Sequence, residues 1–142
     1  MPDPEQIIKP LARRVVAAII VRDDGKILIC QRNKEQPLGL KWEFPGGKIE
    51  PNEEPVAALE RELNEELGII AEIGEEVERF VHTYRNGGSV ELAFFRVQKY
   101  SGEITNRIFN DVRWADRTQL PRFDFLEADV KLVREIAAGK IV

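Results

Sequence analysis

The sequence predicts an α/β (α+β) fold in which helices pack on a mixed β-sheet. Three observations favour this class. β-Branched runs bounded by turn residues predict strands in the first third of the chain and again in its middle. An apolar repeat at intervals of three and four residues predicts a helix between these strand regions, and a second such repeat predicts a helix near the C-terminal end. Strands interrupted by separate helices are typical of a sheet covered by helices.

The strands are predicted from apolar runs and the turns between them. They lie at residues 13–22, 26–32, 42–44, 70–84, 89–98 and 112–115. The first two runs are separated by Asp23-Asp24-Gly25, so we expect them to pair as a hairpin with a largely buried interior. Asn86-Gly87-Gly88 predicts a second hairpin later in the chain, between 70–84 and 89–98.

Two amphipathic helices are expected. The first has its start signal at Pro51-Asn52-Glu53 and its stop signal at Gly68, and the second occupies residues 126–138 and is closed by Gly139. Each carries an apolar stripe that would pack on the sheet. In the first helix this stripe consists of Val56, Leu59, Leu63 and Leu67.

Length and charge limit what the protein can be. A chain of 142 residues can bury one core, so we expect a single domain at 1–142, with 1–12 as an N-terminal arm. Nothing at that end is long and apolar enough for a signal peptide or a membrane span, so we expect a cytoplasmic protein without membrane association. The net charge of −4 argues against a nucleic-acid polymer as partner, because that requires clustered Lys and Arg.

Three glutamates share one face of the first helix. Glu62, Glu65 and Glu66 stand at i, i+3 and i+4, where like charges repel by about 0.2–0.5 kcal/mol per pair on a solvated surface. Such a set is either a solvated acidic face or a place for a hard divalent cation, because Mg²⁺ prefers oxygen ligands and commonly bridges carboxylates to substrate phosphates. The residues around the three glutamates decide between a solvated acidic face and a cation site.

From Gly47 onward, the chain matches the pattern G-x5-E-x7-REU-x-EE-x-GU, in which U is aliphatic. This stretch resembles the Nudix box, and the flanking WEFPGGKIEP is most similar to the MutT-like branch of Nudix hydrolases. The resemblance implies the Nudix fold, a mixed β-sheet sandwiched between α-helices. It also favours the cation over the solvated face.

The resemblance also implies a metal site and a reaction. Glu62, Glu65 and Glu66 would hold Mg²⁺ or Mn²⁺ together with the backbone carbonyl of Gly46. A metal there converts the repulsion between carboxylates and a triphosphate into a bridging interaction. The reaction implied is hydrolysis of a nucleoside diphosphate linked to another group, here a (deoxy)nucleoside triphosphate cut to the monophosphate and pyrophosphate.

The catalytic set implied by the same resemblance is Glu53, Arg61, Glu62 and Glu65. Glu53 and Arg61 would pair to orient the helix. Glu62 or a neighbouring carboxylate would act as the base that orients water, since at least one of several crowded carboxylates has a raised pKa.

Five further residues are expected to bind the substrate. Arg32 and Lys48 match basic positions of MutT-like proteins and would meet phosphate oxygens. Asp124 falls where these relatives place an Asn or Asp that reads the base edge. Val15 and Ala17 alternate along the first strand and would form the floor of the base pocket.

Several alternatives stay open at this point. The base is either an oxidised guanine, as in 8-oxo-dGTP, or a cytosine. The same chemistry would also serve ADP-ribose, a dinucleoside polyphosphate or a capped RNA end, and a non-catalytic nucleotide-sensing module is a further alternative. Many MutT-like proteins have an extra Glu before the strand that here contains Trp114, whereas Asp111 is the only acid in that segment, so the number of metals stays open. The protein is expected to be a monomer or a homodimer.

Overall fold

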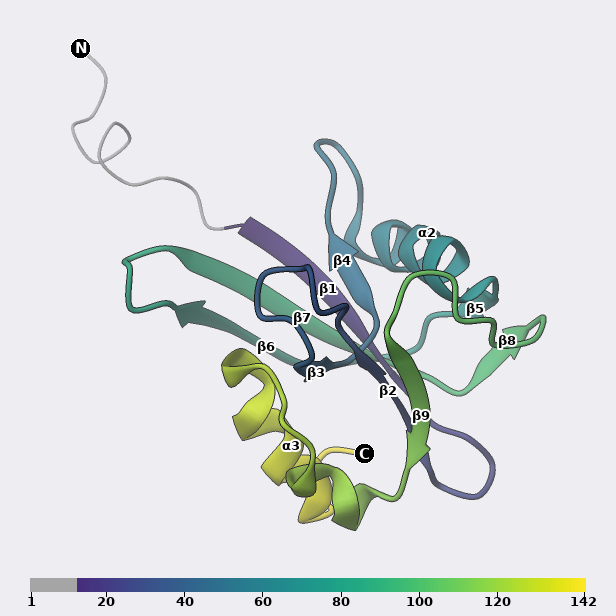
Figure 1. The fold of residues 1–142 in the computed structure, drawn as a ribbon. Coiled ribbons are helices and arrows are strands. Elements are labelled where there is room, and N and C mark those ends of the chain that lie inside the picture. The colour runs from purple at the N-terminus through teal and green to yellow at the C-terminus, as the bar shows by residue number, and fades with distance from the viewer. Residues whose placement is uncertain (1–12) are drawn as a thin grey trace.

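The structure, a computed structural model, describes residues 13–142 (Figure 1). The predicted arm at 1–12 lies outside the described residues. Along the described chain the main elements are β1 (Arg13–Ile20), β2 (Ile27–Gln31), β3 (Trp42–Glu43), β4 (Gly46–Lys48), α2 (Pro55–Leu67), β5 (Ile70–Glu72), β6 (Glu76–Thr83), β7 (Ser89–Val97), β8 (Lys99–Ser101), β9 (Asp111–Ala115) and α3 (Val130–Ala137). Short 3₁₀ helices at Arg117–Arg122 and Glu127–Asp129 precede α3.

The predicted α/β class is confirmed. Neither described helix is both long and apolar enough to cross a membrane.

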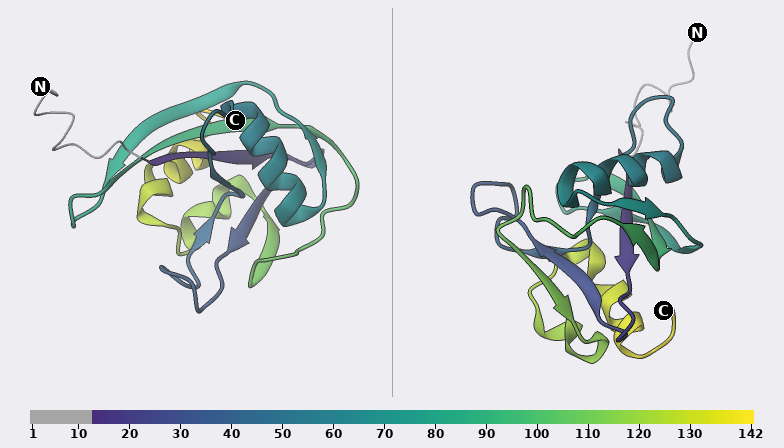
Figure 2. Two further views of the ribbon diagram at one scale, coloured as in Figure 1. Left: turned by 90° about the horizontal axis from the view of Figure 1, so that it is seen from above. Right: turned by 90° about the vertical axis from the view of Figure 1, so that its right-hand side faces the viewer.

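The described strands form three sheets, with the orders β4-β1-β7-β6, β3-β2-β9 and β5-β8. The largest is mixed, because β1 runs parallel to β7 and antiparallel to β4. Alternate residues of β1 enter two separate cores: Val16 and Ala18 pack with the leucines of α2, whereas Ala17 and Ile19 pack with the apolar face of α3. The two helices therefore cover opposite faces of this sheet (Figure 2).

The predicted hairpin of the first two strands is wrong. The turn itself forms, since the amide of Gly25 donates to the carbonyl of Arg22, but only the bridge between Val21 and Ile27 continues it. Beyond that bridge, β1 and β2 diverge into different sheets, where β1 pairs with β4 and β7 and β2 pairs with β3 and β9. Because both strands are apolar on both faces, their sequences do not specify which strand they pair with. The same turn residues can connect two strands of one hairpin or two strands that belong to different sheets.

The second predicted hairpin is confirmed. β6 and β7 pair antiparallel, and the turn between them is closed by Gly88, whose amide donates to the side chain of Asn86. The long strand predicted at 70–84 is interrupted, because β5 leaves to pair with β8. Where the chain passes from β5 to β6, the amide of Gly74 donates to the carbonyl of Arg96. The strand predicted at 112–115 is present as β9.

Helix α2 begins later than predicted. The chain makes a turn at 51–52, with Asn52 at a φ of 65°, and the helix starts only at Pro55, a residue suited to the first helical position. Its end at Gly68 is as predicted, with a left-handed φ of 71°. Of the predicted apolar stripe, Val56 is 39% exposed, whereas the other members are fully buried. The helix α3 also starts later than predicted, because residues 127–129 form a 3₁₀ turn.

Candidate active site

Strand β4 brings the backbone of two glycines against both β1 and α2. A Cβ on Gly46 would lie 2.0 Å from the carbonyl oxygen of Val16, and a Cβ on Gly47 would lie 2.5 Å from Cδ of Glu62. At Gly46 a side chain would meet backbone atoms of β1, whereas at Gly47 it would displace the carboxyl group of Glu62. Gly46 and Gly47 are the first two residues of β4, and the absence of side chains on them lets the glutamate face of α2 approach the sheet.

Glu62 and Glu66 lie together in this space. Only 15% of the Glu62 side chain is exposed, and Glu66 is 9% exposed. The two carboxyl groups are within hydrogen-bonding reach of each other, and the amide of Gly46 donates to Oε1 of Glu66 at 3.2 Å. Burial, with the charges of Glu62 and Glu43, raises the pKa of Glu66 well above its usual range. A carboxyl in this environment either keeps a proton or needs a cation beside it.

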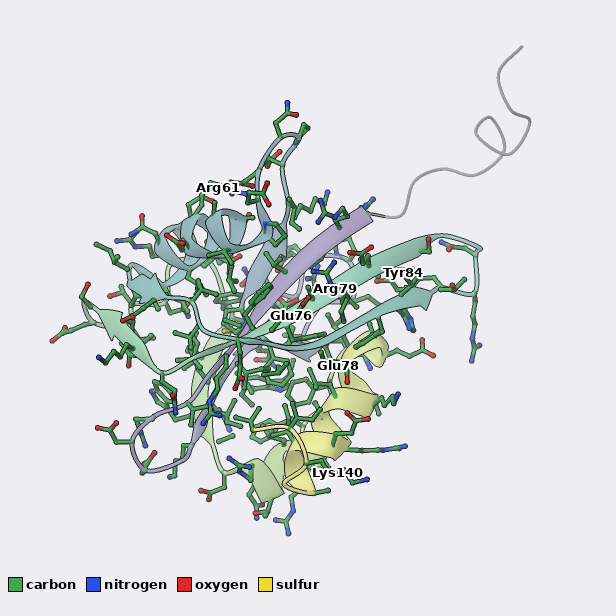
Figure 3. All side chains as sticks on the ribbon, turned by 180° about the vertical axis from the view of Figure 1, so that it is seen from behind. Arg61, Glu76, Glu78, Arg79, Tyr84 and Lys140 are labelled. Atoms are coloured by element: carbon green, nitrogen blue, oxygen red, sulfur yellow. The ribbon has the colours of Figure 1, made fainter. Side chains whose placement is uncertain are left out.

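Arg61 connects the loop before α2 to the glutamates. Its Nε and Nη2 donate to the two oxygens of Glu53 at 2.8 and 2.9 Å, a bidentate pair, and its Nη1 donates to Glu62 at 2.9 Å. Nη2 also reaches the carbonyl of Lys48 at 3.2 Å. The Arg61 guanidinium, helped by the amide of Glu50, lowers the pKa of Glu53 to about 2. Figure 3 places Arg61 between α2 and this loop, where it sets the position of Glu62.

The glutamates are not yet arranged as a complete ligand set. Among residues 13–142, no group of three Asp, Glu, His or Cys side chains stands close enough to hold a metal ion. The Glu65 side chain is 60% exposed, and its carboxylate lies 3.5 Å from Nη1 of Arg61. The donors nevertheless fit a hard cation, because Glu62 and Glu66 are neighbouring oxygen donors and the backbone of Gly46 lies beside them.

Three of the predicted substrate residues, Lys48, Val15 and Ala17, lie on one face of the largest sheet. Lys48 pairs across strands with Val15, and Ala17 follows two positions later on the same face. Val15 is partly exposed and Ala17 is buried. Arg32 is at the end of β2, where its Nη1 donates to Glu43 at 3.1 Å and its Nε donates to the carbonyl of Pro37. It is thus held in place next to β3.

The carboxylate of Asp124 lies at the surface. Its side chain is 73% exposed and accepts a hydrogen bond from Lys41 Nζ at 2.8 Å, while its backbone carbonyl accepts from the amide of Trp42. The structure therefore does not bring this carboxylate into a buried setting with Val15 and Ala17. Its role in reading the base stays a prediction.

The sequence patterns did not predict a role for Asp129, a second carboxyl five residues after Asp124. It is 4% exposed at the start of α3, and burial, with the charge of Glu43, raises its pKa to about 8. The signal was available: Asp129 stands four positions before Val133 and seven before Ile136, so it interrupts the apolar stripe of the helix. Glu43, whose pKa is also raised by burial, links this carboxyl electrostatically to Glu66.

Asp111, the only acid in the segment before Trp114, is engaged locally. One of its oxygens accepts from the amide of Val112 and the other from Nε of Arg113 at 2.8 Å. Its carboxylate is therefore committed within β9.

Comparisons with known proteins agree with this geometry. The model of the NUDIX domain family matches residues 11–136. The chain is 37% identical over 124 residues to the CTP pyrophosphohydrolase of Escherichia coli K12 and 35% identical over 123 residues to the 8-oxo-dGTP diphosphatase of Haemophilus influenzae, covering 87% of this chain and 90% of each relative.

Solved structures show the same fold. The solution structure of the E. coli ORF135 protein matches with a TM-score of 0.80 at 36% identity, covering 92% of this chain and 94% of that one. A MutT structure from work on Aliivibrio salmonicida and Vibrio cholerae matches with a TM-score of 0.78 at 29% identity, covering 91% and 99%. With its glutamate-bearing helix packed against a Gly-Gly strand, this chain belongs to the Nudix family and is a MutT-like hydrolase.

Proposed function

We propose that this protein is a divalent-metal-dependent pyrophosphohydrolase that cuts a (deoxy)nucleoside triphosphate to the monophosphate and pyrophosphate. The observation that carries the proposal is the packing of Glu62 and Glu66 against the glycine backbone of β4. Two crowded carboxyls, one of them almost fully buried, lower the stability of the folded protein when no cation is bound between them. They are useful where a cation and an anionic substrate meet.

The metal would be Mg²⁺ or Mn²⁺, held by Glu62, Glu65, Glu66 and the carbonyl of Gly46. When bound, it supplies neutralisation of the charge on the phosphate oxygens. The residues of the chain would position the catalytic carboxylate and accept the proton. Arg61, fixed by Glu53, keeps Glu62 in position, and a carboxylate of this cluster accepts the proton of the attacking water.

The phosphates would be bound by two basic residues from different strands. Lys48 projects from β4 on the same face as Val15, and Arg32 stands at the end of β2, already oriented by Glu43. An Arg whose fork is held by a carboxylate has less entropy to lose when a phosphate binds. Val15 and Ala17 would provide the apolar floor under the base.

The base would be read by a carboxyl, and the two candidates differ in burial. Asp124 is exposed and accepts a hydrogen bond from Lys41. Asp129, with its pKa near 8, keeps its proton at neutral pH and can donate and accept together. A neutral carboxyl of this kind complements O6 and N1–H of a guanine, and equally N3 and the amino group of a cytosine. Both 8-oxo-dGTP and a cytosine nucleotide therefore remain within the proposal, in line with the names of the two relatives.

A turnover screen tests the proposal. Purified protein is assayed with Mg²⁺ or Mn²⁺ over ordinary, oxidised and methylated (deoxy)nucleoside triphosphates, together with ADP-ribose and a dinucleoside polyphosphate. We expect release of pyrophosphate and monophosphate, with one nucleoside triphosphate favoured about a hundredfold in kcat/KM. Turnover confined to ADP-ribose or the dinucleoside polyphosphate would refute the substrate class, and no turnover of any compound would refute the enzyme assignment.

The same proposal assigns the protein to the cytoplasm, where a free nucleotide pool is the substrate. Its partner is then a small molecule rather than a nucleic-acid polymer, and it would work as a monomer or homodimer. An enzyme that removes oxidised nucleotides would protect DNA from their incorporation.

A further inference from the structure

The last turn of α2 concentrates negative charge. It carries Glu65 and Glu66, and none of residues 64–67 is basic. The carbonyls at the C-terminal end of a helix have no partners inside the helix and carry partial negative charge. Two carboxylates beside them are therefore unfavourable unless another part of the chain supplies donors and positive charge.

Residues 102–110, which we call the strap, supply both. Figure 1 shows this segment, between β8 and β9, passing along the end of α2. The amide of Thr105 donates to the carbonyl of Leu67 at 2.8 Å, and the amide of Arg107 donates to the carbonyl of Glu66 at 3.1 Å. The guanidinium of Arg107 then donates through Nη1 to the carbonyl of Asn64 at 3.0 Å. The carbonyls of Glu66 and Leu67 are thus satisfied by a segment about 40 residues away in sequence, and the carbonyl of Asn64, which also accepts from the amide of Gly68, gains a second donor.

The Arg107 side chain lies directly over the residue that ends the helix. A Cβ on Gly68 would be 2.9 Å from Nη2 of Arg107, so the absence of a side chain there gives the guanidinium its place. A glycine at position 68 therefore serves two purposes: it adopts the left-handed φ that ends the helix, and it leaves space for the Arg107 guanidinium.

The far end of the strap is anchored to β2. The amide of Asn110 donates to the carbonyl of Gln31 at 2.9 Å, and its side chain donates to that of Gln31 at 2.6 Å. Between the two anchors, Phe109 is 9% exposed and packs into the core beneath α2. Because both ends are held, the strap is a fixed support rather than a loose loop. It joins the glutamate turn to the strand that leads to Arg32.

We propose that Arg107 is a positioning residue for the metal-binding turn. It holds the last turn of α2 in helical form and offsets the charge of its carbonyls, so that Glu65 and Glu66 can converge on one cation. This inference rests on the proposed function, because it assumes that the turn binds a divalent metal. The strap thus supports the ligands from behind, and Asp111, the residue that follows it, is paired with Arg113.

Binding of Mn²⁺ to the nucleotide-free protein tests this role directly. Free Mn²⁺ is followed by electron paramagnetic resonance for the wild type, Arg107→Ala and Arg107→Lys. We expect Arg107→Ala to weaken Mn²⁺ binding about tenfold, in the range found when residues that orient metal ligands are removed. Arg107→Lys should recover part of the loss, because it keeps the charge but not the fork. Arg79→Ala is the matched control, since it removes an ion-paired Arg from β6.

Kinetics give a second readout. In Arg107→Ala, the Mn²⁺ concentration needed for half-maximal activity should rise by the same factor, while KM for the nucleotide at saturating Mn²⁺ stays within about twofold of wild type. Wild-type affinity for Mn²⁺ in folded Arg107→Ala, checked by circular dichroism, would overturn the positioning role. A loss in Arg107→Lys as large as in Arg107→Ala, with Arg79→Ala equally weakened, would also overturn it. A wild type that binds no Mn²⁺ would refute the proposed function itself.

Discussion

The carboxyl group of Glu62 occupies the space that a side chain on Gly47 would fill, with a hypothetical Cβ only 2.5 Å from its Cδ. A helix side chain and a strand backbone are therefore in direct contact at the centre of the site. This contact brings together a glycine and a glutamate that are 15 residues apart in the sequence.

Gly47→Ala should displace the Glu62 carboxyl without unfolding the protein, because the clashing atoms are at the end of a flexible side chain. A displacement of about 1 Å can cost on the order of a hundredfold in rate. We expect kcat to fall by about that factor, with little change in Tm. Gly88→Ala in the β6–β7 turn is the control and should keep normal turnover. Full activity in Gly47→Ala would show that Glu62 can act from another position.

Arg61→Lys should separate charge from geometry in the network around Glu53. Lysine keeps the positive charge but cannot make the bidentate pair with Glu53 and reach Glu62 together. We expect kcat to fall roughly 10–100-fold, measured by steady-state turnover at saturating metal. Arg79→Lys on β6, whose Arg pairs with Glu76 and Glu91, should be unaffected. Equal activities of the two variants would argue that charge alone is sufficient.

Glu65→Gln and Glu66→Gln should each lower kcat by a factor on the order of 100 or more, since each would remove a charged ligand of the proposed metal while keeping the size of the side chain. Thermal unfolding provides the second measurement. Addition of Mn²⁺ should raise the Tm of the wild type, because the ion binds only the folded state, and should raise it less in either variant. Chelation by EDTA should abolish turnover. Unchanged kcat in both variants would exclude these two glutamates as ligands.

Asp129→Asn should change how stability depends on pH. The pKa of Asp129 is raised from 3.8 to about 8, so between these values the folded protein keeps a proton that the unfolded chain has lost. The wild type is therefore stabilised at low pH and loses this contribution as pH rises through that window, by at most about 1.4 kcal/mol per pH unit. Relative to the wild type, the variant should be more stable at pH 8 than at pH 5.

Urea unfolding at the two pH values measures this effect. Asp124→Asn is the control, because its exposed carboxylate should leave the profile unchanged. Parallel pH profiles for wild type and Asp129→Asn would contradict a buried, neutral Asp129.

Local sequence patterns were sufficient for several features of this protein. The spacing of Leu59, Leu63 and Leu67 predicted the packed face of α2, and Asn86-Gly87-Gly88 predicted a hairpin that is present. Each of these depends on helix periodicity or turn chemistry within a few residues, which the sequence carries directly.

The remaining features depend on contacts between distant segments. β1 and β2 were equally able to pair with each other or with other strands, and only assembly of the two cores separated them. Asp124 and Asp129 are acids only five residues apart, but the first is exposed and the second is buried, where the charge of Glu43 acts on it. The strap reaches α2 only because β8 and β9 place its ends. Pairing, burial and long-range capping are set by which surfaces meet in three dimensions, and no local pattern encodes that choice.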